Sequence, residues 1–168
     1  MRGNRQWLTL GVTVVLSMSA CAAPGTAENT SSASSVTFAD PWAGSADMGM
    51  AAVFGTFTNG SDRDAVVVAG ESPAAARVEL HEVAPDAGGN NTMRPKEGGI
   101  TVPAGATKEL VPGGDHLMLM ELGQPLEPGA DVALTITFDD GSTLPITAQV
   151  RDFAGGAEEY SPGPHAHG

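Results

Sequence analysis

Cysteine is almost absent from the sequence. Cys21 is the only one among 168 residues, so neither an intramolecular disulfide nor a thiolate cluster for a metal can form. A blue copper centre also needs a cysteine thiolate ligand, and Cys21 lies at the end of the N-terminal signal described below, which excludes electron-transfer proteins of that type. Catalytic motifs are missing as well: there is no HExxH, no glycine-rich phosphate loop and no Ser-His-Asp set at recognisable spacing. We therefore expect a protein that is not an enzyme.

Basic residues are also scarce. The chain has 8 Lys and Arg against 20 Asp and Glu, which gives a formal charge of −12 at pH 7. Such an acidic surface repels nucleic acid and attracts cations or a basic partner. Acidity that only aids solubility explains the composition equally well. No nucleic-acid partner is expected in either case.

An uncharged stretch follows two arginines at residues 7–20, and it is too short and too rich in Ser and Thr for a transmembrane helix. This pattern is typical of a signal peptide, here residues 1–20. It ends in Met18-Ser19-Ala20-Cys21, which resembles the bacterial lipobox. The sequence thus predicts export and a lipid on Cys21 that anchors the protein to the outer, extracytoplasmic or periplasmic, face of the cell membrane. Ordinary cleavage beside the small residues, which would give a soluble product, is the alternative.

Alternation with period two runs through residues 36–152 and predicts an all-β domain. The clearest case is residues 130–138, where every second residue is apolar, followed by a turn at 139–142 and renewed alternation, which indicates a hairpin. Residues 21–35 have little to bury and are interpreted as a flexible spacer. We predict a β-sandwich or Greek-key barrel. The expected strands are 50–58, 64–69, 77–83, 100–102, 107–111, 116–122, 130–138 and 144–150.

Two potential metal ligands lie in a strictly alternating segment. Leu117 and Leu119 are expected to face the core, which turns His116, Met118 and Met120 toward a solvent-facing rim. Residues two apart on a strand have Cα atoms about 6.5 to 7 Å apart, so an imidazole and a thioether can reach one ion. For Met120 alone we favour a packing role.

A second pair lies upstream. His81 is expected to face away from the core, and the glycine- and asparagine-rich loop at 86–92 could fold Met93 back toward it. His81, Met93, His116 and Met118 then form a two-His, two-Met set. Neutral thioether sulfur favours Cu(I) over Zn(II), Mg(II) or Ca(II). On spacing alone, a purely structural role for these side chains is an equally good interpretation.

Four segments carry a resemblance to a known family: RVELHEV, NTMRPKEGGITVPAG, KELVPGGDHLMLMEL and the closing hairpin. They resemble the periplasmic copper chaperones called PCuAC over essentially all of residues 36–151. The resemblance implies a cupredoxin-like β-sandwich with a Cu(I) site at His81, Met93, His116 and Met118. It also implies a copper-accepting partner, such as the copper subunit of cytochrome c oxidase or one of its assembly factors.

The C-terminal residues 153–168 have a composition typical of a mobile tail. His165 and His167 form a His-x-His pair that could bind Cu(II) or pass an ion to the main site, although chance explains two histidines equally well. Elsewhere, Met48 and Met50 are expected to pack in the core or a loop, and Trp42 on the sandwich.

Three functions are compatible with these observations. The first is a copper chaperone with a specific acceptor, and the second is a copper store or scavenger that uses the same ligands. The third is a surface-anchored interaction domain in which the four side chains do not converge. Convergence in a structure separates the third from the others, and the rate of transfer to an acceptor separates the first two.

Overall fold

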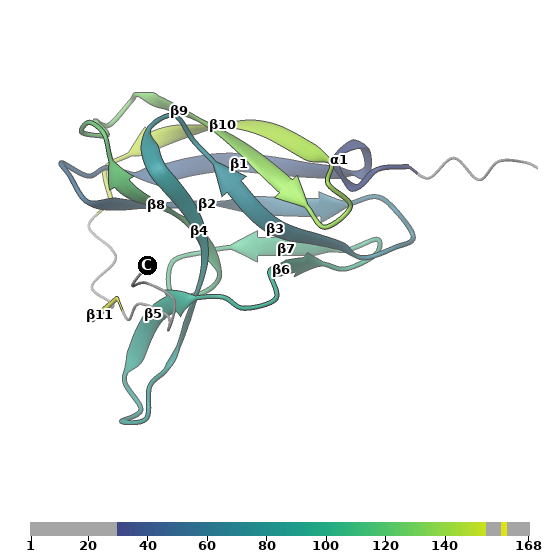
Figure 1. The fold of residues 1–168 in the computed structure, drawn as a ribbon, viewed down its shortest axis with the longest axis horizontal. Helices are drawn as coiled ribbons and strands as arrows, with labels where there is room; N and C mark the ends of the chain where they lie inside the picture. Colours follow the sequence, from purple (N-terminus) through teal and green to yellow (C-terminus); the bar gives the residue numbers. More distant parts are fainter. Residues whose placement is uncertain (1–29, 154–158, 161–168) are drawn as a thin grey trace, which may run out of the picture.

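Seven strands close into a barrel in the computed structural model, which describes residues 30–153 and 159–160. Their order around the barrel is β4-β8-β2-β1-β10-β9-β3, and β3 pairs with β4 to complete the ring (Figure 1). The prediction of an all-β fold is confirmed, in its barrel form. The barrel strands are β1 (Val36–Gly44), β2 (Met50–Asn59), β3 (Ala65–Glu71), β4 (Ala75–Pro85), β8 (His116–Leu122), β9 (Asp131–Phe138) and β10 (Thr143–Arg151).

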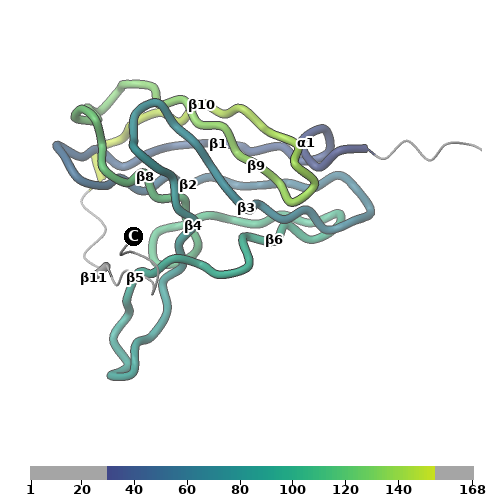
Figure 2. The backbone as a smooth tube through the Cα atoms, viewed as in Figure 1, coloured from purple at the N-terminus to yellow at the C-terminus, as the bar shows by residue number. Residues whose placement is uncertain are grey.

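Four shorter strands extend the barrel at its edges. Strand β5 (Asn91–Pro95) pairs with β4, β6 (Ile100–Val102) with β3, and β7 (Thr107–Leu110) with β2. Strand β11 (Glu159–Tyr160) runs parallel to β5. The β4–β5 hairpin projects from the barrel, and its tip is the loop that follows β4 (Figure 2).

The core follows from the alternation seen in the sequence. Along β9, Val132, Leu134, Ile136 and Phe138 are all buried, and β10 pairs with β9 in the expected hairpin. Strands β1 and β5 were not predicted. In β1 the alternation is broken by a bulge between Ala39 and Trp42, and β5 is short and lies within a loop-like composition. Trp42 packs against Phe54 and Phe153, as expected, with ring centroids 4.6 and 5.2 Å away.

Both ends of the domain differ from the prediction. Residues Ser32–Ser35, assigned to the spacer, form a short helix, α1, whose Ser32 amide donates to Asp140 Oδ2 at 2.7 Å. At the other end, the backbone of Glu159–Tyr160 forms a strand where a mobile tail was expected. The signal peptide at 1–20, Cys21, His165 and His167 lie outside the described residues. Within the described part, no helix has the length and apolar character needed to span a membrane.

Candidate metal centre

Strand pairing brings the two predicted histidines together. Strands β4 and β8 are antiparallel, and their register places His81 directly opposite His116, with ring centroids 5.6 Å apart. The β4–β5 hairpin then returns the chain so that Met93 pairs with Val83. The Met93 sulfur reaches His116, with Sδ 3.0 Å from Nε2. The loop at 86–92 therefore folds the chain back, as expected. The side chain of Met93 was expected to approach His81, and in the structure its sulfur contacts His116.

The methionines of this region form an apolar cluster of their own. Met93, Met118 and Met120 pack together, separate from the main core, and Ala52 and Val83 pack against them. Met118 thus belongs to the same cluster as Met93. The four predicted site residues are gathered in one place, and whether they bind a metal stays a prediction.

The prediction that His116 and Met118 lie on a solvent-facing rim is wrong. His81, His116 and Met118 are 0%, 3% and 3% exposed. The outer face of β8 is covered because Met93 from β5 and Phe54 from β2 pack over it, with the Phe54 ring 5.9 Å from the ring of His116. Sequence alternation separates the two faces of a strand, but it does not show what other segments of the chain place on each face.

A pocket of about 350 Å³ gives access to the buried site. His116, Met93 and Met118 line it, together with Met50 and with residues of the loop before β8. Met50 and Met48 were expected to pack in the core or a loop, but they are 38% and 68% exposed. Met120 is 5% exposed, in agreement with the packing role predicted for it.

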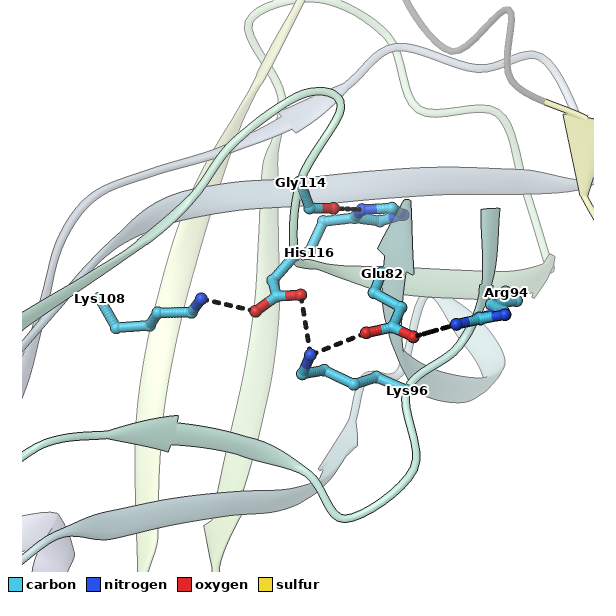
Figure 3. Close-up of polar contacts among 7 residues, drawn as sticks. Glu82, Arg94, Lys96, Lys108, Gly114 and His116 are labelled. Atoms are coloured by element: carbon cyan, nitrogen blue, oxygen red, sulfur yellow. Dashed lines mark hydrogen bonds and ion pairs between the residues drawn. The ribbon is translucent and has the colours of Figure 1, made fainter. Parts of the chain in front are cut away.

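Hydrogen bonding fixes which nitrogen of His116 faces the sulfur. The Gly114 carbonyl lies 3.0 Å from Nδ1 (Figure 3), and a carbonyl can only accept, so Nδ1 carries the proton. In a neutral ring the lone pair is then on Nε2, the atom that points at Met93 Sδ. Two lone-pair donors, one nitrogen and one sulfur, therefore face each other. A soft cation that binds both atoms would turn this contact into two favourable bonds.

A carboxylate orients the second histidine. Glu79 lies two residues before His81 on the same face of β4, and its Oε2 accepts a hydrogen bond from His81 Nε2 at 2.8 Å. Burial lowers the pKa of His81 below its ordinary value, and the hydrogen bond from the ring to Glu79 opposes this shift without reversing it. Arg77 holds the other side of the Glu79 carboxylate at 2.7 Å. Burial raises the pKa of Glu79, but the hydrogen bonds from Arg77 and His81 outweigh burial and lower it.

Glu79 was not among the predicted site residues, although a signal for it was present. In the segment VELHE, Glu79 and His81 are two apart and must share a face. A carboxylate that binds the second nitrogen of a metal-ligating histidine is a recurrent feature of metal sites.

A chain of ion pairs lies on one side of the site and connects its segments (Figure 3). Asp115, which precedes His116, binds Lys108 at 2.6 Å and Lys96 at 3.2 Å. Lys96 continues to Glu82 at 2.9 Å, and Glu82 binds Arg94 at 3.0 Å. Three members, Asp115, Glu82 and Arg94, are direct sequence neighbours of His116, His81 and Met93. The network thus restrains the backbone next to three of the predicted ligands. Among the described residues no group of three or more His, Cys, Asp or Glu side chains could hold a metal ion.

Comparison with known proteins identifies the family. The model for the family described as "Putative lipoprotein LpqE-like" matches residues 36–150. The chain belongs to the LpqE-like family. A curated relative, "Putative lipoprotein Lxx21020" of Leifsonia xyli subsp. xyli, is 39% identical to this LpqE-like chain over 150 residues, which cover 88% of the chain and 90% of the relative.

Solved structures with the same fold include PCuAC domains. The copper-bound PCuAC domain from PmoF2 superposes with a TM-score of 0.59 at 20% identity, over 71% of the LpqE-like chain and 94% of that domain. The Cu(I) form of DR1885 from Deinococcus radiodurans gives 0.53 at 29% identity, over 77% and 88% of the two chains. The cupredoxin-like fold implied by the PCuAC resemblance is confirmed. The matching family model carries the LpqE-like name instead.

Proposed function

We propose that this protein is an extracytoplasmic copper chaperone that binds Cu(I) through His81, Met93, His116 and Met118 and delivers it to an acceptor protein. The acceptor we propose is the copper subunit of cytochrome c oxidase or one of its assembly factors. The observation that carries the proposal is the 3.0 Å approach of His116 Nε2 to Met93 Sδ beside a pocket that Met118 also lines. Two solved structures with this fold, one copper-bound and one a Cu(I) form, support the choice of metal.

The chemistry of these donors suits a transferable Cu(I) ion. Imidazole nitrogen and thioether sulfur are neutral, and thioether is a soft ligand that favours Cu(I). Thiols oxidise outside the cytoplasm, so methionine and histidine are the practical donors in that compartment. Glu79 and the Gly114 carbonyl hold the two imidazoles in fixed orientations, so little ordering is needed when the ion binds.

The copper store is the second candidate function, because it would use the same ligands. Copper transfer to an acceptor separates the two. We expect the Cu(I)-loaded protein to transfer its ion to an apo copper subunit or assembly factor faster than a small-molecule Cu(I) chelate of the same affinity does. Equal rates from protein and chelate would favour the store. Val68→Ala, at an exposed position on β3, is the control that should leave transfer unchanged.

The anchor and the tail complete the proposal. A lipid on Cys21 would hold the domain at the outer face of the membrane, so Cys21→Ser should move the protein from the membrane fraction to the soluble fraction with the same thermal unfolding curve. Retention in the membrane would contradict the anchor.

For His165 and His167 we propose a weaker Cu(II) site, and deletion of residues 161–168 should abolish it while Cu(I) binding remains. An unchanged Cu(II) titration would show that the tail histidines do not bind.

A further inference from the structure

One soft donor of the pocket is not used by the proposed ligand set. Of the described His and Met side chains, the pocket is lined by Met50, Met93, His116 and Met118, whereas His81 is fully buried. Met50 is 38% exposed, while Met93, His116 and Met118 are at most 7% exposed. Met50 is therefore the thioether of this pocket that solvent and a docking protein reach first.

Strand register links Met50 to the buried cluster. On β2 and β8, Met50 lies directly opposite Met120 and Ala52 lies opposite Met118. Residues directly opposite in antiparallel strands have Cβ atoms about 4.5 to 5.5 Å apart, within reach of two methionine side chains. Met120 in turn packs with Met118 and Met93. Strand register and the shared pocket thus link the exposed Met50 to the methionine cluster that holds the sulfur in contact with His116.

The small side chain of Ala52 helps to keep this cluster accessible. Ala52 lies between Met50 and Phe54 on the outer face of β2, and it lines the pocket opposite Met118. A large residue there would fill the space between Met50 and Met118. Ala52 is partly buried and packs on the methionine cluster. The space beside its small side chain therefore adjoins the methionine side chains.

We propose that Met50 is an entry and exit ligand for Cu(I), an inference that rests on the function proposed above. Without it, an ion that leaves the buried set must exchange soft donors for water, a hard ligand that binds Cu(I) poorly. With Met50, the ion changes one thioether for another before it reaches the surface. Because Met50 acts on the path in both directions, its removal slows loading and release together and changes the equilibrium affinity little.

Met50→Leu tests the inference because it removes the sulfur and nearly conserves volume. The control is Met48→Leu, since Met48 is 68% exposed and two residues away, outside the lining of the pocket. Stopped-flow mixing with a chromogenic Cu(I) chelator measures both loading and removal. We expect both rates to fall several-fold in Met50→Leu and to stay at the wild-type value in Met48→Leu.

A second measurement reports contact with the ion directly. In protein labelled with ¹³C at the methionine methyl groups, titration with Ag(I), a redox-inert substitute for Cu(I), should shift the Met50 resonance and leave that of Met48 in place. Wild-type rates in Met50→Leu together with a stationary Met50 resonance would overturn the inference. If the wild type nevertheless retains Cu(I) against the chelator, the proposed function survives. Failure of the wild type to retain Cu(I) would overturn both.

Discussion

Met118 has two roles at the residue scale, because it is a proposed ligand and also part of a buried apolar cluster. Truncation to alanine would remove the sulfur and leave a cavity, and cavities in cores destabilise proteins. Loss of binding in Met118→Ala would therefore have two explanations. Leucine has nearly the volume of methionine and no sulfur, so Met118→Leu separates the roles.

We expect Met118→Leu to weaken Cu(I) binding strongly while it changes the free energy of unfolding by less than about 1.5 kcal/mol. Leu119→Ala, on the core face of the same strand and fully buried, should cost about 2 to 5 kcal/mol and leave Cu(I) affinity unchanged in the folded protein. Urea unfolding of the apo forms and competitive Cu(I) titration of the same samples check both. Wild-type affinity in Met118→Leu would remove Met118 from the ligand set.

A glycine in β2 is required for close packing beside the site. A Cβ atom on Gly55 would lie 2.6 Å from Phe38 Cζ. The Phe38 ring packs against the ring of buried Phe57, with ring centroids 4.3 Å apart. We expect Gly55→Ala to destabilise the fold by about 1 to 3 kcal/mol, the usual range for overpacking. In the control Gly60→Ala the added atom meets its nearest neighbour at 3.5 Å, an ordinary contact. Equal unfolding midpoints for the two variants would show that the Phe38 ring moves aside without cost.

The sequence predicted which face of β8 each residue occupies, but it did not predict what surrounds that residue. Period-two alternation correctly separated Leu117 and Leu119 from His116 and Met118. It could not show that the second face is also buried, because the covering side chain, Met93, comes from a strand 23 residues earlier than His116. Residue type and spacing therefore predicted that these side chains lie together, but not that they are buried.

At the element scale, the β4–β5 hairpin is the part of the fold that assembles the site. It turns the chain after His81 and brings Met93 to the pocket. The glycine-rich loop made this turn predictable, whereas β5 itself was missed because a strand of 5 residues beside glycines and a proline has little periodic signal. Strand β8 was predicted with the bounds that it has in the structure, since its alternation is uninterrupted.

The β9–β10 turn holds α1 on the barrel through Asp140. Its carboxylate accepts hydrogen bonds from Ser142 and from the Ser32 amide, and these lower its pKa well below the ordinary value of 3.8. The ionised group therefore stabilises the fold above about pH 4, and this contribution is lost as the pH falls toward the lower pKa of the folded state.

Asp140→Asn should consequently lower stability at neutral pH by about 1 kcal/mol or less, since the group is exposed. It should also make stability less sensitive to pH between neutral and acid conditions, and it should speed amide exchange at Ser32. Asp131→Asn, an exposed carboxylate at the start of β9, is the matched control. Urea unfolding midpoints at neutral and acid pH check this account, and parallel pH profiles for the wild type and Asp140→Asn would contradict it.

On the scale of the whole molecule, the barrel closes where β3 and β4 meet. The only residue pair in that register is Gly70 and Val78, and a Cβ on Gly70 would lie 3.0 Å from Val78 Cγ1. Alternation and turn composition predicted an all-β domain from local signals. They could not predict this closure, because it depends on one short contact between strands whose other partners in the barrel are β9 and β8.

The most direct test of the account is an anaerobic Cu(I) titration against a chromogenic Cu(I) competitor, followed by X-ray absorption at the copper edge. The wild-type domain should retain a single Cu(I) per chain, with nitrogen and sulfur scatterers at the metal. The double variant Met93→Leu and Met118→Leu should fold and lose this ion to the competitor. If the competitor removes all copper from the wild type, or if the double variant retains copper equally well, the His and Met side chains gathered between β4, β5 and β8 are not a copper site.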